Sequence, residues 1–161
     1  MRSLVVYDSK FGNTAQLAEA IAAMLHESGT VEVGPVERIG TGWLGEVDLL
    51  VVGGPTQAHG VSPEMRTWLA ALAGHDLAGL PVLAFDTRYR KPAWLTGSAA
   101  RRIAARLRAA GAALQGGPVS FFVVASEGPL EAGELDRALA WVRVEVAPLL
   151  ASRPPAAAVA R

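Results

Sequence analysis

Short apolar runs alternate along the chain with longer stretches in which apolar residues recur every three or four positions. Apolar runs are typical of strands buried on both faces, and the three-to-four spacing is typical of helices that bury one face. The runs predict strands at residues 4–7, 31–36, 46–52, 81–85 and 119–125. The spacing predicts helices around residues 14–25, 63–72, 100–107 and 135–146. This alternation predicts an α/β fold, a three-layer, doubly wound, five-stranded parallel sheet.

Local signals mark several helix boundaries. Ser62 is a capping residue, Pro63 suits a first helical position, and Glu64 adds an acid to the first turn. Gly29 and Gly111 follow the last periodic residues of two other helices and predict their ends.

The first strand runs directly into a small polar loop and then into a helix, which together predict an anion site. Ser9 and Thr14 offer hydroxyl groups, and Gly12 lets a ligand approach the backbone without a Cβ in the way. The amides and the positive dipole end of the helix would favour a phosphate at this position. An alternative is that Ser9 and Asn13 only cap the helix.

The segment from Val5 to Ile21 resembles the signature of the flavodoxin family. In that family, two hydrophobic residues and an aromatic residue precede a Ser or Thr. A small residue and a Thr come next, and the helix then carries an Ala and an aliphatic residue. The resemblance implies a flavodoxin-like sheet with strand order 2-1-3-4-5. It also implies a loop that wraps the phosphate of FMN, formed by Ser9, Lys10, Phe11, Gly12, Asn13 and Thr14. Many members have a hydroxyl residue where this chain has Phe11, so one side-chain hydrogen bond to the phosphate is expected to be missing while the amide still donates.

Two further loops are expected to enclose the flavin ring, because they follow neighbouring strands of such a sheet. After the third strand, the resemblance assigns the inner face of the ring to Pro55, Thr56, Gln57, Ala58, His59 and Gly60. After the fourth strand, it assigns the outer face to Asp86, Thr87, Arg88, Tyr89 and Trp94. Tyr89 is the first candidate to stack on the ring and Trp94 the second. The alternatives are that His59 is a solvated loop residue and that Trp94 packs against the following helix.

The charges balance at 15 basic and 15 acidic residues, yet cations gather after the fourth strand. The gathered cations are Arg88, Arg90, Lys91, Arg101, Arg102, Arg106 and Arg108. Reduced flavin tends to be anionic, so nearby cations would raise its potential. The hypothesis is a less negative couple than in acidic-rimmed flavodoxins, or an anionic partner or substrate. For Arg101, Arg106 and Arg108 a solvated helix face is an equal alternative.

Several other chemistries are disfavoured. The chain has no cysteine, so disulfides, thiolate nucleophiles and iron–sulfur clusters are excluded. The three histidines, His26, His59 and His75, lack metal-ligand spacing, and we expect no metal site. No Gly-x-Ser-x-Gly elbow occurs, and no Gly-x-Gly-x-x-Gly follows the first strand. Neither nucleic-acid binding nor the acid cluster of a phospho-receiver domain is supported.

The length of 161 residues, 51% of them hydrophobic, predicts one domain over residues 1–151. A proline pair followed by alanines predicts a flexible tail over residues 152–161. No signal peptide or membrane span is recognised, so we expect a cytoplasmic protein without membrane contacts. No insertion splits the expected fifth strand, which is typical of short-chain members.

The favoured function is electron transfer through non-covalently bound FMN, with a redox partner protein or a small-molecule acceptor. One alternative is a small FMN-dependent oxidoreductase acting on a quinone- or porphyrinogen-type substrate, in which His59 or Tyr89 would be the first proton donors to test. Another is a phosphate-binding regulatory module without flavin. A carrier needs no catalytic side chain, because the flavin holds the electrons. The oligomeric state is open, and a monomer is consistent with the sequence.

Overall fold

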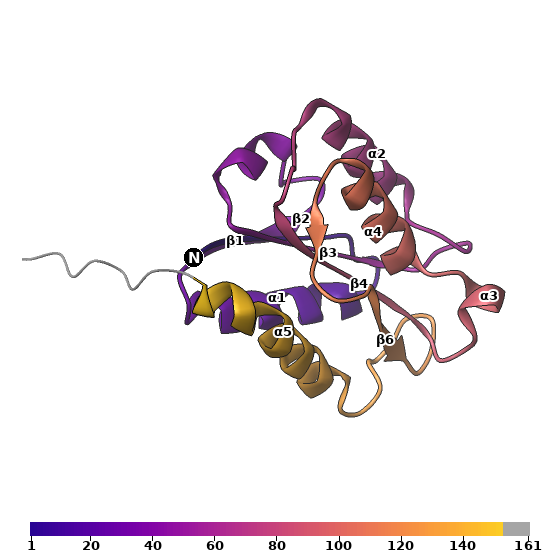
Figure 1. The fold of residues 1–161 in the computed structure, drawn as a ribbon. Coiled ribbons are helices and arrows are strands. Elements are labelled where there is room, and N and C mark those ends of the chain that lie inside the picture. Colours follow the sequence, from indigo (N-terminus) through magenta and orange to yellow (C-terminus); the bar gives the residue numbers. More distant parts are fainter. Residues whose placement is uncertain (153–161) are drawn as a thin grey trace, which may run out of the picture.

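Parallel strands form one sheet in the computed structural model, which describes residues 1–152 (Figure 1). The strands are β1 (Arg2–Tyr7), β2 (Thr30–Pro35), β3 (Leu49–Pro55), β4 (Pro81–Tyr89), β5 (Ala113–Leu114) and β6 (Val119–Val123). Their order is β2-β1-β3-β4-β5, and β6 also pairs with β4. This order confirms the predicted doubly wound fold. Apart from residue 152, the predicted tail lies outside the described residues.

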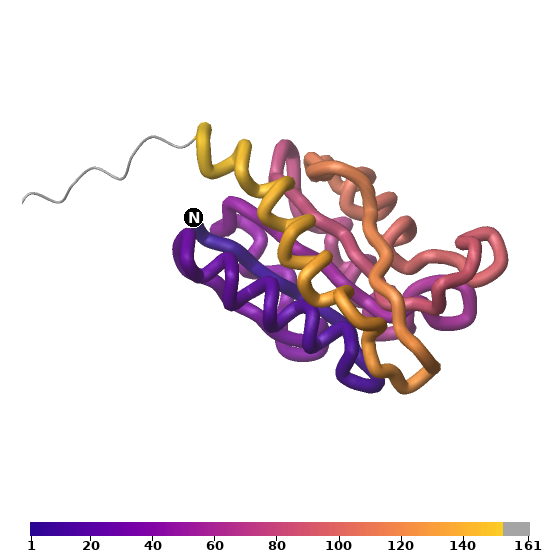
Figure 2. The backbone as a smooth tube through the Cα atoms, turned by 90° about the horizontal axis from the view of Figure 1, so that it is seen from below, coloured from indigo at the N-terminus to yellow at the C-terminus, as the bar shows by residue number. Residues whose placement is uncertain are grey.

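Helices cover both faces of the sheet. The α-helices are α1 (Asn13–His26), α2 (Pro63–Ala71), α3 (Ala93–Thr96), α4 (Ala99–Ala109) and α5 (Glu134–Ala151). Within residues 1–152, the 3₁₀ helices are η1 (Thr41–Glu46) and η2 (Leu72–Gly74). Figure 1 shows α2 and α4 on one face and α1 and α5 on the other, and in Figure 2 the latter pair lie side by side. Within residues 1–152, no helix combines the length and the apolar character needed to span a bilayer.

The alternation of side chains along the strands divides the core between the two faces. Leu4 and Val6 of β1 pack with the residues of α2 and α4, whereas Val5 packs with those of α1 and α5. All three side chains are fully buried. A central strand whose neighbours on both faces are helices must be apolar at every position, which explains the uninterrupted apolar runs of the sequence.

The predicted start of α2 is confirmed. The Ser62 hydroxyl accepts a hydrogen bond from the amide of Met65 at 3.0 Å, and Pro63 is the first helical residue. This cap satisfies one of the amides that a helix start leaves without a partner.

The fifth position of the sheet differs from the prediction of one continuous strand over residues 119–125. It holds two segments, β5 and β6, because the residues between them cannot continue the ladder. Gly116 has a positive φ of 59° and Pro118 has no amide proton. Val82 pairs with Leu114 and Phe85 pairs with Val119, so two extra residues bulge out opposite β4.

Strand β4 is four residues longer than the predicted strand over residues 81–85. Its extension pairs with β6 from Phe85↔Val119 to Tyr89↔Val123. Residues 86–89, expected in a loop, therefore belong to the sheet. No local pattern in the sequence indicates this extension, because pairing with a distant strand produces it.

All strands run in parallel, so their carboxyl ends lie at one end of the molecule, on the right in Figure 1. The segments that follow β1, β3, β4 and β6 meet there, together with α3. Ligands of doubly wound sheets bind at this end, beside the point where the strand order reverses.

Candidate functional site

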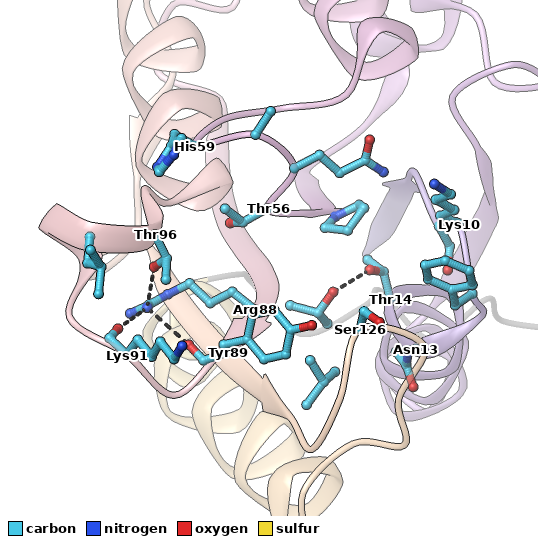
Figure 3. A pocket seen from close by; sticks show the side chains of 18 residues that line it. Lys10, Asn13, Thr14, Thr56, His59, Arg88, Tyr89, Lys91, Thr96 and Ser126 are labelled. Atoms are coloured by element: carbon cyan, nitrogen blue, oxygen red, sulfur yellow. Dashed lines mark hydrogen bonds between the residues drawn. The ribbon is translucent and has the colours of Figure 1, made fainter.

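A cavity of about 740 Å³ opens at the carboxyl end of the sheet (Figure 3). Its size is in the range of small-molecule and cofactor sites. Most of the predicted site residues line it, namely Ser9, Lys10, Phe11, Asn13, Thr14, Pro55, Thr56, Gln57, Ala58, His59, Thr87, Arg88 and Tyr89. The sequence-based selection missed Lys91, Leu95, Thr96, Val123 and Ser126. The predicted residues Gly12, Gly60, Asp86 and Trp94 are not among the lining residues.

The loop between β1 and α1 presents main-chain donors that have no acceptor. The Ser9 hydroxyl oxygen accepts from the amides of Gly12 and Ala15, each at 3.1 Å, and holds the loop in a tight turn. Gly12 has a φ of +89°, a conformation that favours glycine. Within residues 1–152, no hydrogen bond is made by the loop and helix-start amides of Lys10, Phe11, Asn13 and Thr14. A phosphate group fits such a set of free amides at the start of a 14-residue helix.

The two threonines on the floor of the cavity add a further donor. The hydroxyl oxygens of Thr14 and Thr87 lie 2.8 Å apart, and both side chains are buried (Figure 3). One hydroxyl proton makes this hydrogen bond. The other has no acceptor within the described part of the chain and can donate to a ligand.

The segment after β6 closes the side of the cavity that the β1–α1 loop forms, which we call the phosphate side after the group that its amides would suit. The Asn13 side-chain amide donates to the carbonyl oxygen of Glu127 at 3.2 Å, and Ser126 lines the cavity next to it. Val123 and Ser126 were not predicted to line the cavity. Their position at the carboxyl end of β6, the strand that pairs with β4, is the sequence feature that could have indicated them. The side chain of Asn13 thus joins two loops rather than capping α1.

The segment after β3 is a tight hairpin rather than the long open loop that its composition suggested. Gln57 and Gly60 exchange two main-chain hydrogen bonds of 2.9 and 2.7 Å. Between them, Ala58 and His59 have φ values of +41° and +69°, the pattern of a type I′ turn. This conformation is uncommon for residues with a Cβ and costs of order 1–3 kcal/mol each, so it persists only where the surroundings enforce it.

Contacts with the segment after α3 hold this hairpin in place. His59 and Gly97 form an isolated parallel bridge. A Cβ on Gly97 would come within 2.3 Å of the His59 carbonyl oxygen, so only glycine permits this approach. His59 lines the cavity opposite the phosphate side, as Figure 3 shows.

Tyr89 ends β4 and lies in Figure 3 between Arg88 and Ser126. It lines the cavity with 40% of its surface exposed, as a residue that stacks on a ligand would be. Leu95 and Thr96 of α3 continue the same wall. The sequence predicted that the segment after the fourth strand contributes to the site, but not which of its side chains line the cavity.

Asp86 and Trp94 lie elsewhere than predicted. Asp86 is completely buried and does not line the cavity, and one of its two carboxylate oxygens holds three hydrogen bonds. Its Oδ2 accepts from the Thr56 hydroxyl at 3.0 Å, the Ser98 hydroxyl at 2.7 Å and the Ala100 amide at 2.9 Å. It therefore connects the segments that enclose the site. Trp94 is 84% exposed on the short helix α3, so it neither lines the cavity nor packs on the following helix.

Gly12 and Gly60 shape the site through their backbones. Gly12 provides the left-handed turn before α1, and Gly60 closes the hairpin after β3. Neither has a side chain that could line the cavity.

Carboxylates neutralise part of the predicted cation cluster. The Nε of Arg88 lies 3.8 Å from Asp86, and Arg90 pairs with Glu131 at 2.7 Å and Glu134 at 3.8 Å. Lys10 and Lys91 form no ion pair within residues 1–152. No Asp or Glu of the described residues lines the cavity, so its fixed charges are all positive. On α4, Arg101, Arg102, Arg106 and Arg108 lie on the exposed face.

Two carboxylates near the site have shifted pKa values. Burial raises the pKa of Asp8, directly before the phosphate-side loop, and the charges of Glu37 and Glu64 add to the shift against a hydrogen bond from Ser62. Burial alone would raise the pKa of Glu134 as well. Hydrogen bonds from Arg137 and the Phe122 amide, with the charges of Arg137 and Arg90, outweigh burial and lower it.

Metal binding has no structural support in the described part of the chain, where no three His, Cys, Asp or Glu side chains gather closely enough to hold an ion. The donors at the cavity are amides, hydroxyls and cations, a set that suits an anion.

Comparison with known proteins agrees with this architecture. A family model described as a flavodoxin domain matches residues 4–94. No curated protein sequence matches the chain. Among solved structures, the chain is similar to a flavodoxin from the domain Archaea, with 21% identity, a TM-score of 0.76 and coverage of 94% of this chain and 99% of that one. It is also similar to oxidised Flavodoxin 1 from Bacillus cereus, with 20% identity, a TM-score of 0.79 and coverage of 91% and 98%.

The chain also resembles part of a larger protein. Rubredoxin oxygen:oxidoreductase from Desulfovibrio gigas shares 18% identity with a TM-score of 0.77, and the match covers 96% of this chain but 37% of that one. At sequence identities of about 20%, similarity to a solved structure shows only that the fold is shared.

Proposed function

The chain belongs to the flavodoxin domain family, and on that basis we propose that it binds FMN without a covalent bond and carries electrons through it. The bound flavin would supply the redox chemistry, because its ring accepts and releases the electrons. Residues 1–151 would form the one domain that holds it. The proposed partner is a redox protein or a small-molecule acceptor.

The observation that carries this proposal is the set of unpartnered amides between Lys10 and Thr14 at the start of α1, next to a cavity of about 740 Å³. Four donors without a protein acceptor can bind a phosphate group without breaking an existing hydrogen bond. The free hydroxyl proton of the Thr14–Thr87 pair adds a fifth donor. Hydrogen bonds to a charged acceptor are about twice as strong as those between neutral groups.

The remaining walls of the cavity suit a flat ring. The backbone from Pro55 to His59 forms one wall, and Tyr89 with α3 forms the other. We assign the stacking contact to Tyr89, since Trp94 points into solvent. The main-chain hydrogen bonds of the hairpin after β3, and the hydrogen bonds from Thr56 and Ser98 to Asp86, would hold the two walls at a fixed separation. This would restrict the ring to one orientation.

The purified protein tests the proposal through its visible spectrum. We expect yellow flavin bands, release of FMN on denaturation, and bands that bleach on anaerobic reduction with dithionite and return when a one-electron acceptor is added. A colourless protein that takes up no added FMN would contradict the proposal and favour the flavin-free phosphate-binding module. Sustained NAD(P)H-dependent turnover of a quinone or porphyrinogen by the protein alone would instead identify the oxidoreductase.

A further inference from the structure

We propose that the pair of Arg88 and Asp86 sets the reduction potential of the bound flavin, with Arg88 favouring the reduced form and Asp86 opposing it. The inference rests on the proposed binding of FMN.

Arg88 is a fixed cation in the cavity wall. Its side chain is 12% exposed, and Nε donates to the Ser120 hydroxyl at 2.8 Å. Nη1 donates to the carbonyl oxygens of Tyr89 and Lys91 and to the hydroxyl of Thr96 (Figure 3). These bonds hold the guanidinium in place, so its charge cannot swing out into solvent.

One nitrogen of the same group remains available. Nη2 of Arg88 makes no hydrogen bond within residues 1–152, while Nε and Nη1 together make four. Arg88 lines the cavity, and a guanidinium cannot lose its proton in a protein. A ligand in the cavity therefore meets a permanent positive charge.

Asp86 places the opposite charge beside the guanidinium but outside the cavity lining. Its Oδ1 lies 3.8 Å from Arg88 Nε and makes no hydrogen bond, and the residue is fully buried outside the cavity lining. The pair thus presents its positive end to the cavity and its negative end to the protein. Because the positive end is nearer, its effect on a ligand exceeds that of the carboxylate.

The direction of the effect follows from the charge balance of flavin reduction. Two electrons from an external donor and one proton convert the neutral oxidised ring into a reduced ring with one negative charge. A nearby cation stabilises the reduced ring more than the oxidised one, and burial limits screening by salt. Binding reduced FMN more tightly than oxidised FMN is the same as raising the potential.

Arg90 provides a matched control in the same segment. It is two residues further along and is likewise an arginine, but it pairs with Glu131 and Glu134 and does not line the cavity. Replacing it removes one positive charge from the neighbourhood and leaves the cavity wall unchanged.

The test is spectroelectrochemical titration of the FMN-loaded protein and of the variants Arg88→Gln, Arg88→Lys and Arg90→Gln. We expect Arg88→Gln to weaken binding of reduced relative to oxidised FMN by about tenfold, equivalent to a two-electron potential lower by about 30 mV. Arg88→Lys, which keeps the charge but loses the fork of hydrogen bonds, should retain most of the wild-type potential. Arg90→Gln should leave it unchanged.

Asp86→Asn separates electrostatics from damage to the site, because removing the carboxylate charge should raise the potential, the opposite of Arg88→Gln. A lower potential in both variants, or an unchanged potential in a flavin-loaded Arg88→Gln protein, overturns the inference. If Asp86→Asn does not fold, the comparison of Arg88→Gln with Arg88→Lys decides. Failure of the wild-type protein to bind FMN would instead overturn the proposed function, and a colourless preparation distinguishes that outcome.

Discussion

At the scale of single residues, the hydroxyl of Thr14 is the clearest test of the phosphate side. We predict that Thr14→Val weakens FMN binding by about 1–3 kcal/mol, because a charge-assisted hydrogen bond is lost together with the contact to Thr87. Quenching of flavin fluorescence on titration measures the affinity. Thr67→Val is the control, since the Thr67 hydroxyl is on α2 and bonds only the Pro63 carbonyl. Equal affinities of the two variants would exclude a role for the hydroxyl pair.

The buried carboxylate of Asp8 predicts a pH-dependent stability. Burial raises its pKa in the folded protein, so ionisation of Asp8 destabilises the fold as the pH rises through that pKa. Asp8→Asn should therefore increase the free energy of unfolding near neutral pH, and this gain should vanish below the ordinary pKa of aspartate. Urea unfolding across a pH series measures both. Glu19→Gln, an exposed acid on α1, is the control, and a loss of stability in Asp8→Asn at neutral pH would refute the prediction.

At the scale of elements, Glu134 joins the start of α5 to β6. It is 3% exposed, and it accepts from the Phe122 amide at 2.7 Å and from Arg137. Because these partners lower its pKa, their stabilisation is complete above the ordinary pKa of glutamate and is lost as the pH falls through the lowered value. Glu134→Gln should be less stable than wild type at neutral pH, and the difference should shrink in acid. A constant difference at every pH, seen by the same urea titration, would contradict this account.

The contact between the hairpin after β3 and the segment after α3 can be tested with two glycines of nearly equal φ. Gly97 and Gly79 have φ values of +74° and +73°, but a Cβ on Gly97 would meet the His59 backbone, whereas one on Gly79 meets nothing within 4 Å. Gly97→Ala should weaken FMN binding at least about tenfold, the effect of about 1.4 kcal/mol. Gly79→Ala places a Cβ at the same positive φ without a contact and should leave the affinity unchanged. Similar affinities of both variants, measured by fluorescence, would show that the hairpin position does not matter.

Local patterns predicted the elements well, and the exceptions depend on distant partners. Strands β1 and β3 can be recognised from their apolar runs, because helices cover both of their faces. The start of α2 can be recognised from the adjacent residues Ser62 and Pro63. Pairing with β6 extends β4, which no local pattern reveals. The same pairing accounts for Asp86: a charged residue at the end of an apolar run resembled a loop residue, but donors from two other segments bury it.

At the scale of the whole molecule, the site exists only where four separate segments meet. The phosphate-side loop could be recognised from the sequence because its donors are adjacent in the chain. The opposite walls could be assigned to segments, but not to residues, because which side chains turn inward depends on how the segments pack. Ser126 and Thr96 enter the cavity from elements that are far apart in sequence, and Trp94, beside Thr96, points away.

The most direct test of the central claim is calorimetric titration of the flavin-free protein with FMN and, in parallel, with riboflavin, which has the same ring but no phosphate group. If the free amides of Lys10, Phe11, Asn13 and Thr14 hold the phosphate, FMN should bind at least about a hundredfold more tightly, since several charge-assisted hydrogen bonds would be lost with riboflavin. Equal affinity for the two flavins, or no binding of either, would contradict the account.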